Sequence, residues 1–195
     1  MNARDLRGGV DEVGRGSLAG PVVAAAVIFE RDLHLEGIQD SKRVAVGRRQ
    51  ELSDLIRRTA VSWAIGAATV AEVDQYNIYQ ATLMAMRRAV LGLEITPTYL
   101  YVDGTAYPDV SYPGKAVVRG DQSIQVVAAA SIVAKVARDS VMVAMSKVYP
   151  DYGFEKHKGY PTTLHLDALV RLGPCAIHRT SYRPVRMLLK GGERP

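Results

Sequence analysis

The sequence predicts an α/β fold in which a mixed five-stranded sheet is flanked by helices and followed by a small helical C-terminal appendage. Three strand-like segments lie early in the chain, helical and strand-like segments then alternate, and a last helical pattern follows Pro150. At 195 residues, 48% of them hydrophobic, the chain can bury one sizeable core. We therefore expect one domain over residues 1–150, with a C-terminal helical segment over residues 151–195 packed on it.

The first half of the chain supplies three of the five strands. Residues 6–13 and 22–29 are apolar and β-branched around a Gly-rich turn, which predicts an antiparallel hairpin. Pro21 stands at the entrance of the second strand, where proline is tolerated. Residues 41–58 have the apolar spacing of an amphipathic helix, and residues 61–70 then read as the third strand.

The second half alternates between helices and buried strands. Residues 77–93 form a strongly amphipathic helical pattern, and residues 98–102 and 116–118 are short apolar strands. Residues 122–148 read as one long alanine-rich helix that stops before Pro150. A last helix is expected over residues 162–172, before a Gly-Pro pair.

Composition favours a nucleic-acid partner. The net charge is +5, and phosphate neutralisation needs grouped cations, although paired arginines also solvate outer helix faces. The longest apolar stretch, residues 21–29, is far shorter than the roughly 18 residues of a membrane span. The polar start and the lone Cys175 predict a cytoplasmic protein. We also expect a monomer that binds no membrane. The grouped cations are Arg48 and Arg49, Arg57 and Arg58, Arg87 and Arg88, Lys156 and Lys158, and the tail from Arg179 to Arg194.

Four acids within or after the predicted strands are the candidates for the chemistry. Asp11 and Glu12 lie inside an apolar strand, where their side chains should point to opposite faces and a buried acid needs a partner or a metal. Asp103 ends a buried strand, and Asp121 follows the next strand just before the long helix. A surface acid at a frayed strand end is the alternative for the first pair, and a helix N-cap is the alternative for Asp121.

Oxygen ligands without Cys or His at ligand spacing favour a hard divalent ion, Mg²⁺ or Mn²⁺, over zinc. Two such ions could activate a water and stabilise a leaving 3′ oxygen, so phosphoryl transfer would need no Ser, Cys or His nucleophile. Asp139 is a rival fourth acid, but it lies about 27 Å along the helix from Asp121.

A series of short segments spans almost the whole chain and carries a family pattern. They are Gly9 to Gly16, Leu18 to Ala25, Asp40 to Lys42, Asn77-Ile78, Ala81-Thr82, Ala85-Met86, Val102 to Gly104, Gly120-Asp121, Ala128 to Asp139, Tyr152 to Tyr160 and His178 to Tyr182. In these segments and in their order the sequence resembles the ribonuclease HII family. The resemblance implies an RNase H-like fold and a metal-dependent endonuclease that cuts the RNA strand of RNA–DNA hybrids.

The resemblance also implies roles for individual residues. The family's four metal-site acids fall on the same four acids that the physical reasoning selects. Main-chain groups of Gly14, Arg15 and Gly16 would contact the ribose 2′-hydroxyl, the group that separates RNA from DNA. The Tyr160 ring would stack on the next deoxyribose and favour RNA-to-DNA junctions. Contacts with phosphates are expected for Lys42, Asn77, Gln80, Ser131 and Lys135.

A few positions depart from the family pattern, and Pro161 beside Tyr160 is the one that bears on junction preference. The others are Ser17, Arg119 and Tyr182. A DNA nuclease or strand-transferase on the same scaffold, a non-catalytic hybrid-binding module and the related ribonuclease HIII family are the alternatives.

Overall fold

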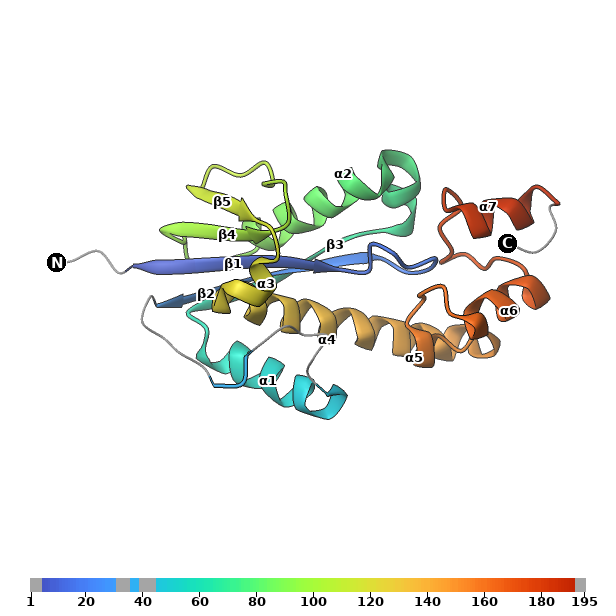
Figure 1. The fold of residues 1–195 in the computed structure, drawn as a ribbon, viewed down its shortest axis with the longest axis horizontal. Coiled ribbons are helices and arrows are strands. Elements are labelled where there is room, and N and C mark those ends of the chain that lie inside the picture. The colour runs from blue at the N-terminus through green and yellow to red at the C-terminus, as the bar shows by residue number, and fades with distance from the viewer. Residues whose placement is uncertain (1–4, 31–35, 39–44, 192–195) are drawn as a thin grey trace. The chain divides into compact units, whose positions relative to one another are not determined.

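A mixed five-stranded sheet organises the chain in the computed structural model, which describes residues 5–30, 36–38 and 45–191 (Figure 1). The strand order is β3-β2-β1-β4-β5. β1 pairs antiparallel with β2 and parallel with β4, and β4 pairs parallel with β5, so the predicted hairpin and mixed sheet are confirmed. The strands are β1 (Leu6–Val13), β2 (Val22–Glu30), β3 (Ser62–Ala68), β4 (Tyr99–Asp103) and β5 (Gly114–Val117).

Helices connect and follow the strands. None of the helices within the described residues is both long and apolar enough to cross a membrane. The helices are α1 (Val46–Thr59), α2 (Val70–Leu91), α3 (Gly120–Ser123), α4 (Gln125–Val148), the 3-10 turn η1 (Pro150–Tyr152), α5 (Phe154–His157), α6 (Thr163–Leu172) and α7 (Arg183–Leu189).

Two of these helices differ from the sequence-based prediction. The helix expected from residue 77 begins at Val70, and Asn77 interrupts it with a φ of 66°. The Asn77 Oδ1 atom accepts hydrogen bonds from the main-chain N–H groups of Tyr79 and Gln80, so it caps the second part of α2. The helix expected over residues 122–148 is broken at Ile124, whose extended backbone separates α3 from α4.

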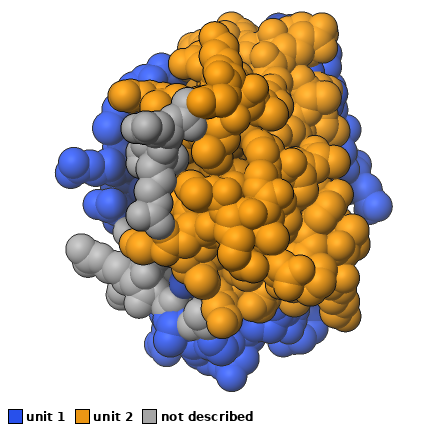
Figure 2. Space-filling view, turned by 90° about the vertical axis from the view of Figure 1, so that its right-hand side faces the viewer, with its two compact units in different colours: residues 1–13, 23–67, 82–137 blue, residues 14–22, 68–81, 138–195 orange. Residues whose placement is uncertain are grey.

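Contacts divide the chain into two compact units, coloured separately in Figure 2. Unit 1 holds most of the sheet, and unit 2 holds the helices after residue 138; the domain boundary expected at residue 150 stays a prediction. Unit 1 comprises residues 1–13, 23–67 and 82–137, and unit 2 comprises residues 14–22, 68–81 and 138–195.

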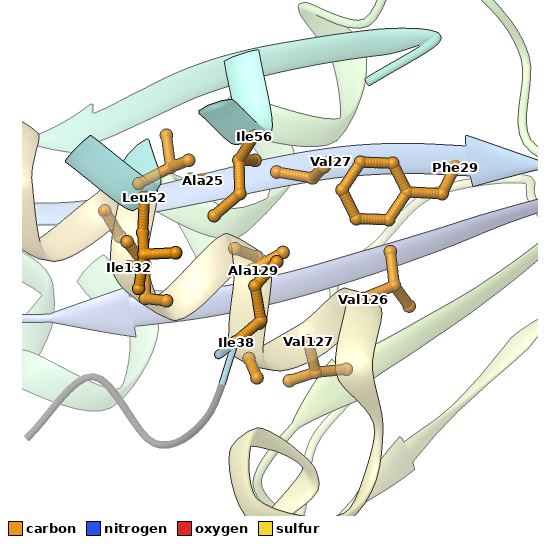
Figure 3. Packing of buried hydrophobic residues seen from close by; sticks show 14 residues of the cluster. Ala25, Val27, Phe29, Ile38, Leu52, Ile56, Val126, Val127, Ala129 and Ile132 are labelled. Atoms are coloured by element: carbon orange, nitrogen blue, oxygen red, sulfur yellow. The ribbon is translucent and has the colours of Figure 1, made fainter. Parts of the chain in front are cut away.

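The main core of unit 1 lies where α1 and the first half of α4 pack against β2 (Figure 3). Ala25, Val27 and Phe29 of β2 lie in one cluster with Leu52 and Ile56 of α1, and all five are buried. Beside this core the backbone of β1 approaches that of α4 closely at Gly9. A Cβ atom on Gly9 would lie 2.2 Å from the Val126 carbonyl oxygen, so only glycine allows this contact.

Within unit 2, Asp74 of α2 hydrogen-bonds to the segment that precedes α7. Its carboxylate accepts hydrogen bonds from the main-chain N–H and hydroxyl groups of both Thr180 and Ser181, at 2.6 to 3.0 Å. Partial burial alone would raise the pKa of Asp74, but these four hydrogen bonds outweigh it and lower the pKa. The carboxylate therefore stabilises the fold in its charged form.

Asp74→Asn is expected to lower the free energy of unfolding by about 1 kcal/mol at pH 7, because a neutral amide keeps only one acceptor and the site is solvent-screened. Since the folded pKa is depressed, the wild-type advantage should hold at neutral pH and shrink as the pH falls through that pKa. Urea unfolding at pH 7 and pH 3 measures this, with the exposed Asp109→Asn as control. A difference that grows on acidification would contradict the assignment.

Candidate metal centre and substrate-binding residues

Three carboxylates converge at one end of the central strands. One oxygen each from Asp11, Glu12 and Asp103 lies within 4.8 Å of the other two. Asp11 and Glu12 come from the end of β1, and Asp103 comes from the end of its parallel neighbour β4. Asp11 and Glu12 are neighbours on β1 and were expected to point to opposite faces of the sheet, yet their carboxylates lie together.

Asp11 is the buried member, with 5% of its surface exposed. Burial raises the pKa of Asp11 well above its ordinary value, and the charges of Glu12 and Asp103 raise it further. The side chain of Ser131 on α4 and the Glu12 main-chain N–H, at 2.7 Å, hydrogen-bond to the Asp11 carboxylate and act in the opposite direction. Burial and repulsion together outweigh these hydrogen bonds, so the ionised cluster needs a positive partner.

Asp121 joins the same end of the sheet. β5 runs parallel to β4 and leads through Arg119, in the left-handed conformation with a φ of 56°, into α3. This turn brings the main-chain N–H of Asp121 within 3.4 Å of Asp103 Oδ1. Asp121 is 7% exposed and lies inside α3, whose N-cap is Arg119, so the structure does not give it the N-cap position. All four predicted acids lie in unit 1.

The donor set fits a divalent cation. The cluster offers carboxylate oxygens with no histidine or cysteine among its members, which suits Mg²⁺ or Mn²⁺. A buried carboxylate beside two others is costly without a cation between them, and this cost is visible in the raised pKa of Asp11. The residues thus meet the chemical requirement of a metal centre.

The Gly14-Arg15-Gly16 turn is held by Arg179, a fully buried guanidinium in unit 2. Arg179 Nη1 donates to the Arg15 carbonyl oxygen at 3.0 Å, and the Tyr182 hydroxyl donates to the same oxygen. In a trans peptide the next N–H points opposite to the carbonyl, so the Gly16 N–H points away from Arg179. Because Gly16 is exposed, the turn can offer this donor to a ligand.

Arg138, also fully buried, links this turn to Tyr160. It donates to the carbonyl oxygens of Ala19, Pro21 and Lys158 at 2.9 to 3.0 Å, and its guanidinium lies 5.5 Å from the centroid of the half-buried Tyr160 ring. Gly14, with a φ of 95°, passes so close that a Cβ atom there would lie 2.1 Å from Arg138 Nε. The first glycine of the turn is thus required by both conformation and space.

The other predicted substrate contacts are spread over several elements. Lys42 falls outside the described residues. Asn77 and Gln80 lie exposed on α2, where the Asn77 side chain also caps the helix, and Lys135 lies one turn beyond Ser131 on α4. Ser131 is 7% exposed and hydrogen-bonds to Asp11, so its observed contact is with the acid cluster.

The structure corrects part of the charge argument. Arg179, counted among the cations of the C-terminal tail, is fully buried, and Arg49 is 8% exposed, so neither guanidinium lies on the surface for phosphate. The buried arginines were missed as supporting residues, but for Arg138 a signal exists. It stands at four-residue spacing from Ala134 and Met142, on a buried stripe of α4, where a charge must be compensated. Arg179 has no periodic pattern around it to mark burial.

Comparison with known proteins gives a consistent result. The sequence profile of the ribonuclease HII family matches residues 8–185. Ribonuclease HII of Nitrosococcus oceani is 54% identical over 182 residues, which cover 93% of this chain and 90% of that protein. Ribonuclease H2 from Pyrococcus horikoshii has a similar structure, with a TM-score of 0.81 at 23% identity, covering 95% of this chain and 98% of the other.

A more distant structure shares the fold. Bst-RNase HIII, solved in complex with Mn²⁺, gives a TM-score of 0.74 at 17% identity, covering 97% of this chain and 71% of its own. The predicted RNase H-like fold is therefore confirmed.

Proposed function

The chain belongs to the ribonuclease HII family and is a hydrolytic ribonuclease H, and from this premise we propose that it nicks duplex DNA at single embedded ribonucleotides as well as cutting the RNA strand of RNA–DNA hybrids. Water adds across the bond between O3′ and phosphorus on the 5′ side of the ribonucleotide and leaves a 3′-hydroxyl and a 5′-phosphate. The enzyme acts as a cytoplasmic monomer.

The convergence of Asp11, Glu12 and Asp103 carries this proposal. These acids and Asp121 hold two divalent ions, Mg²⁺ or Mn²⁺. When bound, the ions supply an activated water and stabilise the charge that develops on the leaving oxygen. Asp11, supported by Ser131, gives the site a buried anchor whose charge is compensated only when a cation is present.

The residues that recognise the sugars of the substrate belong to unit 2. The outward Gly16 N–H and its neighbours Gly14 and Arg15 hydrogen-bond to the 2′-hydroxyl, which DNA lacks. The Tyr160 ring packs on the next sugar and disfavours a second 2′-hydroxyl there. Phosphate oxygens are held by Lys42, Asn77, Gln80, Ser131 and Lys135.

Purified protein with Mg²⁺ or Mn²⁺ is expected to nick a DNA duplex that carries one ribonucleotide, leaving a 3′-hydroxyl that a polymerase extends. A denaturing gel resolves the nick, and the extension assay identifies the end. EDTA should abolish cleavage, because the four acids repel the substrate's phosphates without a cation.

Two controls separate the alternative functions. Cleavage of an all-DNA duplex at a similar rate would indicate a DNA nuclease or strand-transferase. Binding that survives EDTA without cleavage under any metal would indicate a hybrid-binding module. Intact ribonucleotide substrate with well-folded protein and either metal would overturn the proposal.

A further inference from the structure

Three histidines are buried together in unit 2, outside the proposed catalytic machinery. His157, His165 and His178 are 7%, 0% and 2% exposed. The rings of His157 and His165 stack with centroids 4.2 Å apart, and the Phe154 ring meets both edge-on. Buried imidazoles need every ring nitrogen satisfied, so their hydrogen bonds fix where the protons are.

His157 is the first of the three. Its Nδ1 atom accepts a hydrogen bond from the Gly159 main-chain N–H at 3.1 Å and is therefore unprotonated. Its Nε2 atom lies 2.8 Å from the Tyr152 carbonyl oxygen, which only accepts, so Nε2 carries the proton.

His165 and His178 have complementary tautomers. His165 Nδ1 lies 3.0 Å from the Tyr160 carbonyl oxygen and must donate to it, so in the neutral ring Nε2 is an acceptor. His178 Nδ1 accepts from the Cys175 main-chain N–H at 3.0 Å, which leaves the proton on Nε2. The two Nε2 atoms are 3.1 Å apart, and the His178 Nε2–H donates to His165. One proton pattern satisfies all three rings.

This pattern leaves no place for a further proton. Each unprotonated nitrogen already faces an N–H donor, so protonating any ring would set two hydrogens against each other. Burial lowers the pKa of His165 and of His178 to about 4, with further lowering from neighbouring histidines, which agrees with neutral rings. Neutral, fully hydrogen-bonded rings stabilise the local structure and do not exchange protons with a substrate.

The main-chain groups to which these rings hydrogen-bond lie at and next to Tyr160. Its main-chain N–H donates to the His157 carbonyl oxygen at 3.0 Å, and its own carbonyl accepts from His165 Nδ1 and from the Thr162 N–H at 2.8 Å. Both peptide units next to Tyr160 are thereby fixed, as is the Gly159 N–H by His157. With φ and ψ fixed, the ring keeps only its side-chain torsions, and the Arg138 guanidinium lies over it.

We infer that the neutral, hydrogen-bonded rings of His157, His165 and His178 position Tyr160 for the ribonucleotide junction, with the His165 Nδ1–H as the decisive contact. The inference rests on the proposed function, because it takes Tyr160 to contact the substrate. His165 is a positioning residue: it acts through the Tyr160 main chain and touches no substrate.

Two substitutions separate positioning from packing. Asparagine at 165 places an amide N–H where Nδ1 stands and keeps the donor to Tyr160, whereas glutamine reaches the Nε2 position, pairs with His178 and loses that donor. The readout is junction selectivity, the ratio of cleavage rates on a single-ribonucleotide duplex and on a continuous RNA–DNA hybrid. Because one enzyme preparation is used for both substrates, partial unfolding cancels from the ratio.

His165→Gln should lower this ratio about fivefold, the effect of one lost hydrogen bond, and His165→Asn should keep most of it. In a Tyr160→Ala background His165→Gln should lower the ratio no further, since the residue through which it acts is gone. Equal ratios for the two variants, or an undiminished effect without the Tyr160 ring, would overturn the inference.

The wild-type protein offers a test that needs no variant. Nitrogen-15 NMR of the imidazoles should show His165 as the Nδ1–H tautomer and His157 and His178 as Nε2–H tautomers. An Nε2–H tautomer at His165 would overturn the inference even if the enzyme nicks as proposed. The expected tautomers with no cleavage by the wild-type protein would instead count against the proposed function, and would also remove the positioning role that depends on it.

Discussion

Asp11→Asn is expected to reduce cleavage by at least about 10³-fold and, in the absence of metal, to raise the midpoint of thermal unfolding. The loss of activity follows because the buried ligand of the cluster becomes a neutral amide. The gain in stability follows because the pKa of Asp11 is raised by burial and by Glu12 and Asp103, so ionising it at pH 7 costs folding free energy. Asparagine removes that cost.

The same argument predicts the effect of metal. Adding Mg²⁺ or Mn²⁺ should raise the unfolding midpoint of the wild-type protein, since a ligand that binds only the folded state stabilises it, and should have a much smaller effect on Asp11→Asn. Differential scanning fluorimetry with EDTA and with metal gives both comparisons. The exposed Asp109→Asn is the matched control and should change neither activity nor the metal response.

A variant that loses activity together with stability would contradict this assignment, because simple disruption of the fold produces that pairing. A variant that loses activity but is more stable without metal is typical of a functional site at which like charges lie close together. Asp11 differs in this from the buried residues of the apolar core, whose replacement lowers both.

The parts of the fold that the sequence predicted are those with a short-range signal. The strands of the hairpin were predicted from β-branched runs, and α6 was expected before the Gly-Pro pair that ends it. The structure adds its N-cap, Thr162, whose hydroxyl accepts a hydrogen bond from the His165 N–H. The first turns of α2 were missed, although Thr69 and Glu72 form a capping box of reciprocal hydrogen bonds. The capping box is readable in the sequence, but Thr69 was assigned to the predicted strand over residues 61–70.

The candidate site also has a part that could be predicted from the sequence and a part that could not. Strand-end acids could be predicted because a carboxylate within an apolar strand conflicts with burial, and that conflict is readable in the sequence. The spacing of α4 indicates that Arg138 is buried, but the contacts of the buried arginines could not be predicted, because their partners are distant in sequence. Arg138 donates to carbonyl groups more than a hundred residues away, and so does Arg179. The hydrogen bonds of the three buried histidines also depend on ring orientations that only the folded chain defines.

Arg138→Met is expected to lower the free energy of unfolding by about 3 kcal/mol or more. Burial lowers the pKa of Arg138 to about 10, which still leaves the guanidinium charged at neutral pH. Methionine fills much of the volume but leaves three carbonyl oxygens without this donor, the buried one of Ala19 and the part-buried ones of Pro21 and Lys158. A fully buried carbonyl so deprived costs about 1–3 kcal/mol, and the part-buried ones add to this. Urea unfolding at pH 7 measures the loss.

Arg48→Met is the matched control, because the Arg48 side chain is 57% exposed and its ion pair with Glu51, at 2.8 Å, should contribute less than about 1 kcal/mol. Arg138→Lys should fall between wild type and Arg138→Met, since an ammonium keeps the charge but cannot span three carbonyl groups. If Arg138→Met were as stable as Arg48→Met, the carbonyl groups would have found other donors, and the Gly14 turn and Tyr160 would not depend on this guanidinium for their positions. If the loss is as large as expected, both of the proposed substrate-binding elements depend on one buried side chain, and we expect junction cleavage to fall even at temperatures where the variant remains folded.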